Sequence, residues 1–244
     1  MMDFTLTKYS ELLDSLRAYG FEQLTLRHDV DLKPANSLRT AQMEAERGLH
    51  GIYYFRAVPE SWDEKIITLI SLLGHEIGYH YESLTTCNGD VDKAYEDFCR
   101  NLEALRAIVP VRSICMHGSP RSPFDSKDIW KKYDYRSLGI ENEPYLDTDF
   151  SQTFYLTDTG RRWDGYKVSV RDKIPQYQDV WNEQGLTFHS TDDIIEGLWQ
   201  GIIPKRLMLT VHPQRWNPFG LTWGKELILQ SAKNVVKRVI VKTK

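Results

Sequence analysis

Histidines and aspartates follow four short apolar runs in this sequence. The runs lead into Asp29 and Asp31, into His80, into His117, and into His212. Imidazole and carboxylate groups bind Zn²⁺ and similar ions, and they also exchange protons with substrates. One apolar run that ends in His is a weak indication. Four such runs, separated by segments of helical length, predict a single metal or acid/base site.

Asp29 and Asp31 lie two residues apart at the end of the first run, next to His28. In an extended backbone, residues i and i+2 face the same side. One carboxylate could therefore bind a metal while the other accepts a proton from water. For such a pair alone, a loop or helix cap is the better interpretation, because Asp31 shortly precedes Pro34. The three other runs that end in His favour the functional interpretation.

The remaining candidates have similar surroundings. Glu82 follows His80 by two residues, and a His and a carboxylate at that spacing suit Zn²⁺. His212 is placed to protonate a leaving group. His75 lies at the start of its strand, so we expect it to be structural. For His117 or His212 alone, a structural role as a buried, hydrogen-bonded histidine is the better interpretation. Only the combination of the four runs favours a functional role.

The composition limits the classes of protein. A chain of 244 residues suits one α/β domain, so we expect residues 1–244 to form a single catalytic domain. The net charge of −3, from 31 basic and 34 acidic residues, argues against nucleic-acid binding through bulk charge. The sequence contains no run of 18 apolar residues, so we expect no membrane span. Three widely spaced cysteines and no secretion signal predict a reducing, cytoplasmic location, with Cys115 as a buried small residue.

Helical and extended patterns alternate along the chain. We expect strands over residues 24–28, 52–55, 77–80, 111–116, 186–189 and 206–211. We expect helices over residues 9–19, 34–45, 62–73, 91–108, 191–199 and 222–239. The segment 119–180 is predicted to form loops and short strands over the mouth of the site. Alternating strands and helices predict a parallel sheet or barrel, in which the carboxyl ends of the strands face one side.

These motifs, in this order, resemble the polysaccharide deacetylase superfamily, the NodB homology domain of carbohydrate esterase family 4. Residues 74–80, Gly-His-Glu-Ile-Gly-Tyr-His, closely match its second motif, and residues 209–212 match its late Leu-His motif. The first motif, two adjacent aspartates, matches residues 26–31 with one residue inserted. The resemblance spans residues 24–216 and implies a distorted (β/α)7 barrel. It also implies that Asp29 is the general base and that Asp31 binds the metal.

The chain departs from that family in three places. Leu84 stands where a second metal-binding His is expected, so His117 or Glu82 must supply the third ligand, and we favour His117. Residues 116–121 replace the family's Arg-x-Pro-Tyr-Gly motif. The aspartate that pairs with that Arg is not evident, though Asp158 or Asp164 could take its place. The chain therefore resembles a divergent branch found among surface-polysaccharide and O-antigen biosynthesis proteins.

We therefore expect a metal-dependent hydrolase that removes an acetyl or formyl group from the nitrogen of a nucleotide-linked, lipid-linked or oligosaccharide amino sugar. A divalent ion, Zn²⁺ by preference, would activate the attacking water. The expected residues are Asp29 and His212 for catalysis, Asp31, His80, His117 and Glu82 for the metal, and Arg27, Trp163, Arg215 and Trp216 for the substrate. The alternative is a non-catalytic carbohydrate-binding or scaffolding protein of the same fold, because Leu84 breaks the usual metal triad.

Overall fold

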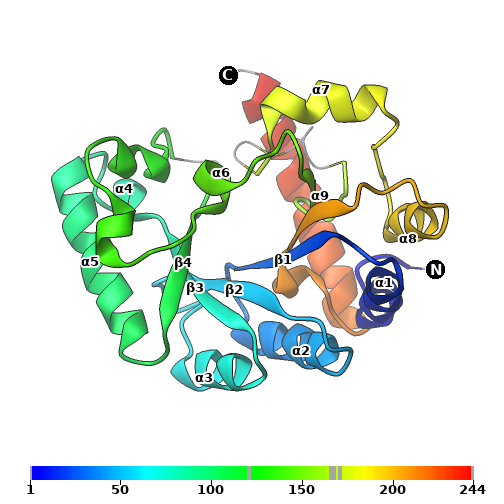
Figure 1. The fold of residues 1–244 in the computed structure, drawn as a ribbon, viewed down its shortest axis with the longest axis horizontal. Coiled ribbons are helices and arrows are strands. Elements are labelled where there is room, and N and C mark those ends of the chain that lie inside the picture. The colour runs from blue at the N-terminus through cyan, green and yellow to red at the C-terminus, as the bar shows by residue number, and fades with distance from the viewer. Residues whose placement is uncertain (1, 120–121, 165–168, 170–171, 243–244) are drawn as a thin grey trace.

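The fold is α/β, with a single all-parallel sheet surrounded by helices (Figure 1). The computed structural model describes residues 2–119, 122–164, 169 and 172–242. The strands are β1 (Gln23–Val30), β2 (Gly51–Phe55), β3 (Glu76–Tyr81), β4 (Val111–Met116), β5 (Phe154–Thr157) and β6 (Arg206–Val211). The helices are α1 (Leu6–Ala18), α2 (Pro34–Ala45), α3 (Glu64–Leu72), α4 (Ser83–Thr86), α5 (Val91–Arg106), α6 (Pro144–Asp147), α7 (Pro175–Glu183), α8 (Thr191–Trp199) and α9 (Leu221–Lys242).

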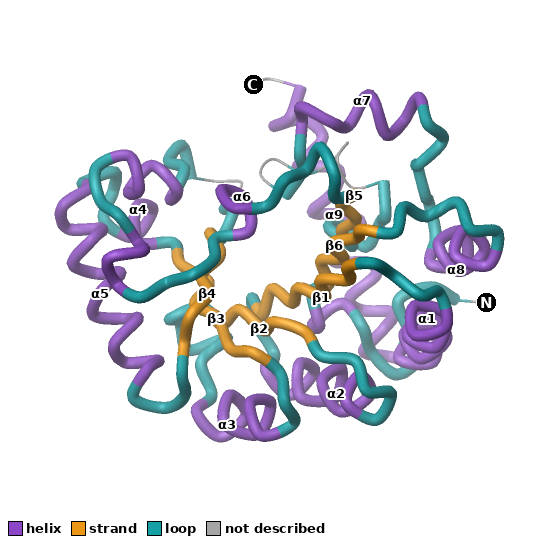
Figure 2. Tube along the Cα trace, viewed as in Figure 1, coloured by secondary structure: helices purple, strands orange, loops and turns teal. Residues whose placement is uncertain are grey.

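The six strands follow the order β4-β3-β2-β1-β6-β5, which is the sequential order of a barrel that stays open between β4 and β5. The sheet curves, and the chain that carries α6 passes between its two edge strands (Figure 2). Asn142 in this connection forms an isolated parallel bridge with Ser113 of β4. The architecture fits a (β/α) barrel-like fold, as the alternating sequence pattern predicts.

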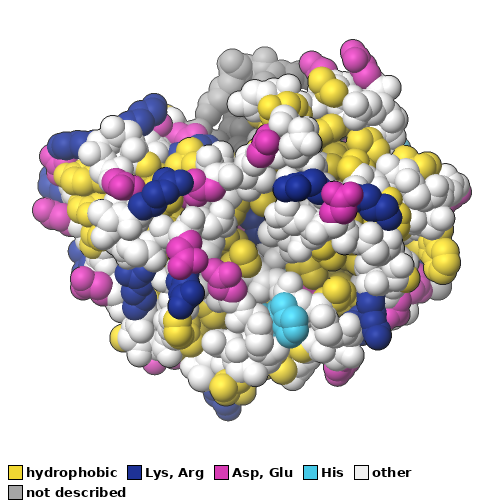
Figure 3. Space-filling view, in the orientation of Figure 1, with side chains coloured by type: hydrophobic (Ala, Val, Ile, Leu, Met, Phe, Trp, Pro, Cys, Tyr) yellow, Lys and Arg dark blue, Asp and Glu magenta, His cyan; other side chains and the backbone are white. Residues whose placement is uncertain are grey.

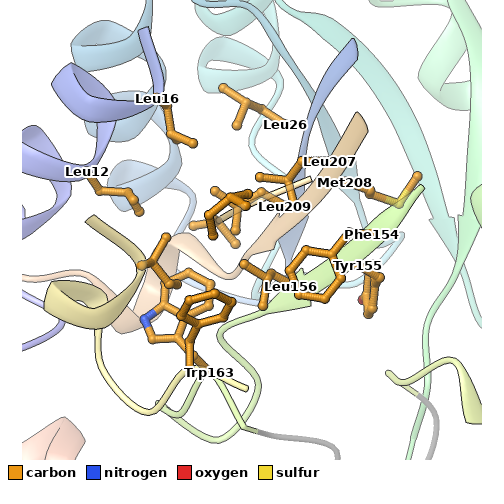
Figure 4. Packing of buried hydrophobic residues seen from close by; sticks show 14 of the residues in the cluster. Leu12, Leu16, Leu26, Phe154, Tyr155, Leu156, Trp163, Leu207, Met208 and Leu209 are labelled. Carbon is orange, nitrogen blue, oxygen red and sulfur yellow. The ribbon is translucent and has the colours of Figure 1, made fainter. Parts of the chain in front are cut away.

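Apolar packing occurs between the sheet and the surrounding helices. One cluster joins α1 and α8 to β1, β5 and β6, and the second joins α3 and α5 to β2, β3 and β4. Figure 4 shows part of the first cluster, where Leu12 and Leu16 of α1 approach Leu26, Leu207 and Leu209 on the strands. The apolar core therefore covers the outer face of the sheet and leaves the inner face to other side chains.

The inner face is largely polar and tightly filled. Gly78 of β3 faces Tyr54, and a Cβ at Gly78 would lie 2.3 Å from Cδ1 of the Tyr54 ring. The Tyr54 hydroxyl lies 2.5 Å from Oγ of Ser113 on β4. The glycine in the second motif therefore makes room for an aromatic ring inside the barrel.

A buried polar network lies on the outer face, between β1 and α2. His28 Nε2 lies 2.7 Å from Oε1 of Glu44, and both side chains are fully buried. The Tyr53 hydroxyl donates to Oε2 of Glu44 at 2.9 Å, and the Tyr9 hydroxyl donates to Oε1. Burial opposes ionisation of Glu44, but His28 and these hydrogen bonds hold its pKa below the usual value. As expected, His75 is structural: its Nε2 donates to the Ala41 carbonyl at 2.9 Å.

Two sequence expectations need correction. Residues 186–189 do not form a strand: Leu186 and Phe188 are buried against the first apolar cluster as irregular chain after a left-handed turn at Gly185. The alternation of apolar residues there reflects packing rather than strand pairing. The segment 119–180, predicted to form loops and short strands, does supply the short strand β5, but it also holds α6 and the start of α7. Residues 120–121, 165–168 and 170–171 of that segment lie outside the described residues.

No described helix is long and apolar enough to cross a bilayer. On the face shown in Figure 3, basic and acidic side chains alternate rather than forming a patch of one sign.

We predict that Glu44→Ala lowers the free energy of unfolding by about 3–5 kcal/mol. Removing one member of a buried charged network leaves its partners desolvated and unpaired. Urea denaturation followed by circular dichroism measures the change. The matched control is Glu46→Ala, at an exposed position two residues along the same chain segment. Equal stability of the two variants would contradict a structural role for the network.

Candidate metal and acid–base site

A pocket opens inside the barrel at the carboxyl ends of the strands. It is lined by Arg27, Asp29, Asp31, His80, Met116, His117, Gly118, Tyr145, Thr159, Ser169, Asp172, His212 and Arg215. Side chains therefore meet here from β1, β3, β4, β5 and β6 or from the residues that follow them. The sequence predicted this convergence for Asp29, Asp31, His80, His117 and His212, and the structure brings all five to the pocket.

The alternation of side chains along β1 selects which residues reach the pocket. Arg27, Asp29 and Asp31 face inward, whereas His28 and Val30 face the helices. This two-residue period follows from extended backbone. His28 is therefore not part of the site, although it stands next to Asp29 in the sequence.

Two histidines direct a free ring nitrogen at Asp31. His80 Nδ1 donates to the Cys115 carbonyl at 2.9 Å, and His117 Nδ1 donates to Oε2 of Glu82 at 2.8 Å. Each Nε2 then faces Oδ1 of Asp31, at 3.7 Å from His80 and 3.6 Å from His117. Burial lowers the pKa of His80 to about 4, so its imidazole is neutral at pH 7.

These three residues fit a divalent metal ion. One donor atom from each of Asp31, His80 and His117 lies within 4.8 Å of the other two. Oδ1 of Asp31 is buried and has no hydrogen-bond partner among the described residues, whereas Oδ2 accepts a hydrogen bond from Gln214 at 3.0 Å. Burial opposes ionisation of Asp31, but the neighbouring histidines hold its pKa well below the usual value. An unsatisfied carboxylate oxygen that faces two imidazole lone pairs is the arrangement that a bound cation completes.

Glu82 takes a different position from the one predicted for a metal ligand. Its Oε2 accepts from the far ring nitrogen of His117, and Arg56 binds its Oε1 at 2.5 Å. Burial opposes ionisation, but His117 and Arg56 lower the pKa of Glu82 to about 2. Glu82 therefore orients His117 from behind, as carboxylates do for metal-binding histidines. Leu84, which stands where the family has a metal-binding His, is buried in the second apolar cluster.

A second group of potential ligands is formed by Asp29, His80 and Cys115. It fits a metal less well, because Asp29 already forms an ion pair and burial raises the pKa of the Cys115 thiol well above its usual value. A protonated thiol is a poor ligand. Cys115 is thus a buried small side chain, as expected from the sequence.

Asp29 is held by Arg27 from the same strand. The guanidinium Nε donates to Oδ1 at 2.9 Å and Nη2 donates to Oδ2 at 2.6 Å, a two-pronged ion pair with both side chains buried. Oδ2 of Asp29 also lies 3.7 Å from Nε2 of His80. Arg27 was predicted to bind substrate, but two of its donors are used to fix Asp29. Its Nη1 is buried without a partner.

His212 is held by Asp158, which follows β5. Nδ1 of His212 donates to Oδ1 of Asp158 at 2.6 Å, and its backbone N–H donates to the same carboxylate. Arg215 and Trp216 also bind Asp158, at 2.7 Å and 2.8 Å. Burial and Arg215 lower the pKa of His212, but Asp158 and Asp31 raise it to a net value above the ordinary one. Nε2 of His212 faces the pocket, 4.0 Å from Oδ2 of Asp31.

Trp163 and Trp216 were expected to bind the substrate, but both lie in the core. Trp216 is fully buried and its ring packs on Phe4 and Tyr9, and Trp163 packs in the same cluster. Neither ring lines the pocket. Arg215 does line the pocket, with one of its nitrogens committed to Asp158.

Sequence reasoning missed Asp172. Its carboxylate lines the pocket and accepts hydrogen bonds from the hydroxyls of Tyr145, Tyr155, Thr157 and Thr159. Burial opposes ionisation, but His212, Arg27 and these hydroxyls hold its pKa well below the usual value. No strand-like run or motif directly precedes it in the sequence, so no sequence signal indicated it. Asp158 was named only as one of two possible partners for an arginine, and Asp164 instead pairs with Arg162 outside this pocket.

A scan against models of known protein families finds no match for this chain, and a search of curated proteins returns none. The geometry of the site is therefore the basis for any statement about its chemistry.

We predict that Asp158→Asn lowers the pKa of His212. The Asp158 carboxylate raises that pKa, so replacing its charge with an amide removes the stabilisation of the imidazolium. NMR titration of the histidine ring protons in chelator-treated protein measures it. Asp149→Asn, at an exposed aspartate, is the control. A His212 titration that does not move in Asp158→Asn would contradict the assigned pairing.

Proposed function

We propose that this protein is a NodB-like, metal-dependent hydrolase that removes an N-acyl group from an amino sugar. The convergence of Asp31, His80 and His117 beside Asp29 and His212 is the observation that carries the proposal. Two acid–base residues on either side of a metal-binding group are what amide hydrolysis requires. A protein that only bound carbohydrate would need neither a general base held by Arg27 nor a general acid held by Asp158.

Asp31, His80 and His117 would hold the metal, with Zn²⁺ the ion best suited to one carboxylate and two imidazoles. When bound, such an ion supplies Lewis-acid polarisation and lowers the pKa of water. The Cys115 carbonyl and Glu82 fix the ring orientation of the two histidines, so both present Nε2 to the ion.

Asp29 is the general base of this proposal. Arg27 holds both of its oxygens in a fixed orientation beside the metal-binding residues. In that position, Asp29 accepts the proton of the attacking water. Buried Arg27 adds a positive charge close to where the amide oxygen gains negative charge, and its unpartnered Nη1 is an available donor.

His212 is the general acid. Its raised pKa keeps a larger fraction of the imidazole protonated at neutral pH, and Nε2 faces the pocket. The ring donates that proton to the departing nitrogen, which leaves as a neutral amine. Before this proton transfer, the Asp158 carboxylate stabilises the protonated ring, and its hydrogen bond to Nδ1 keeps the ring oriented before and after the transfer.

The size of the pocket supports the proposed substrate class. Its volume of about 140 Å³ suits a small acyl group such as acetyl or formyl, with the sugar at the open mouth. All three cysteines are free thiols, which fits a reducing compartment and hence a cytoplasmic sugar precursor of a surface polysaccharide.

We predict that His80→Ala and His117→Ala lose the bound metal, whereas Glu82→Gln retains it with an affinity about 10–100-fold weaker. The two histidines would be direct ligands and Glu82 an orienting partner. Elemental analysis of freshly purified protein and competition with a chelator measure these effects. His50→Ala, at an exposed histidine, is the matched control. Wild-type metal content in His80→Ala, or complete loss in Glu82→Gln, would contradict the ligand set.

We predict that Asp29→Asn keeps the metal but lowers kcat by roughly 10²–10⁴-fold, the usual cost of removing a general base. Asp31→Asn should lose metal and activity together. Release of acetate or formate from N-acyl amino sugars, with elemental analysis of each variant, tests both. Metal loss in Asp29→Asn together with metal retention in Asp31→Asn would show that Asp29 is the metal ligand and Asp31 the general base. Turnover near the wild-type value in both variants would overturn the mechanism.

A further inference from the structure

Helix α9 leaves most of its described apolar side chains exposed to solvent. It contacts the protein through half-buried Trp223, which donates to the Asp3 carbonyl, and through Gln230, which is 6% exposed, and Asn234, which donates to the Gly160 carbonyl. Leu221, Ile228 and Val235 are 86%, 71% and 64% exposed. An ordinary surface helix instead packs its apolar stripe on the core. The apolar side of α9 therefore has no partner within the described chain.

The exposed apolar residues form one continuous stripe. Leu221, Ile228 and Val235 are spaced seven residues apart, close to two helical turns, so they follow one line along α9. Leu229 and Ala232, both exposed, lie beside that line. A contiguous exposed apolar surface of this kind marks a site of interaction.

The charge around the stripe selects the partner. Helix α9 contains five basic residues and one acidic residue, Glu226, which pairs with Lys33, although the whole chain has a net charge of −3. Lys225 and Lys233 are exposed on the part of α9 whose side chains are described. A second copy of this helix would bring like charges together, which disfavours self-association. An anionic lipid surface is complementary both to the cations and to the apolar stripe.

We propose that α9 is an interfacial helix that docks the protein on membranes rich in anionic lipid. The stripe through Ile228 and Val235 enters the boundary between headgroups and acyl chains, and the lysines contact the headgroups. No described helix is long and apolar enough to cross a bilayer, so α9 lies on the membrane rather than spanning it. In the view of Figure 1, α9 runs to the periphery of the molecule.

Contacts connect α9 to the pocket. Asn234 donates to the Gly160 carbonyl at 2.8 Å, and Arg161 donates to the Trp223 carbonyl at 3.2 Å. The loop that holds Gly160 and Arg161 also supplies Asp158, which binds His212. The segment that follows β5 therefore connects α9 to a wall of the pocket. If the proposed hydrolase function holds, this connection favours a lipid-linked amino sugar as the substrate; the docking itself does not depend on that function.

Co-sedimentation of the full chain with vesicles tests the proposal. We expect binding to vesicles of phosphatidylcholine mixed with phosphatidylglycerol, weakened by added NaCl, and little binding to phosphatidylcholine alone. The double variant Lys225→Gln/Lys233→Gln should bind roughly 30-fold more weakly, because each basic residue near an anionic surface contributes severalfold. Ile228→Gln/Val235→Gln should bind at least about tenfold more weakly.

Leu72→Gln is the matched control, because Leu72 is 77% exposed on a different helix. It should bind as the wild type does, and thermal melts should show that every variant folds, since all the changed residues are exposed. Absence of binding to the anionic vesicles, or equal binding to both vesicle types, would overturn the proposal. A dimer seen by light scattering and dissociated by Ile228→Gln would also overturn it by assigning the stripe to a second copy. None of these measurements uses metal content or hydrolysis, so failure of the proposed activity would be seen separately.

Discussion

Charged groups can line the inside of a barrel only when each one has a partner, because an unpaired buried charge is costly. The pocket meets this requirement almost completely: Asp29 has Arg27, Asp158 has His212 and Arg215, and Asp172 has hydroxyl donors. Among the described residues, Oδ1 of Asp31 and Nη1 of Arg27 are the exceptions in this lining. Oδ1 of Asp31 carries negative charge and faces two imidazole nitrogens, so it is the position that a cation would complete.

The sheet separates two kinds of environment, and β1 shows how. Leu26 and Val30 pack on the helices, whereas Arg27 and Asp29 face the pocket, so one strand contributes to both in alternation. His28 also faces outward, and its contact with Glu44 offsets the energetic cost of burying the imidazole ring. Apolar packing on the outer face thus stabilises the sheet, so its inner face can carry the polar side chains of the pocket.

Sequence reasoning succeeded where backbone periodicity decides the outcome. The two-residue spacing of Asp29 and Asp31, and the strand ends at His80, His117 and His212, were enough to predict that these side chains converge. It did not succeed where long-range contacts decide. Glu82 turns to His117 and Arg56, residues 186–189 pack without pairing, and the two tryptophans enter the core. Asp172 lines the pocket, although no local sequence pattern marks it.

Arg27 and Asp29 stand two residues apart on a central strand whose neighbours are β2 and β6. Their pairing is fixed by the pleat of the backbone rather than by the closure of a loop. Forming it costs no loop-ordering entropy when substrate arrives, so the carboxylate is preorganised in the free protein. The loop after β4 takes no part in this ion pair, so changes there would leave the orientation of Asp29 unaltered. In the proposed hydrolase, the surrounding loops could therefore vary with the substrate while the same strand holds the carboxylate.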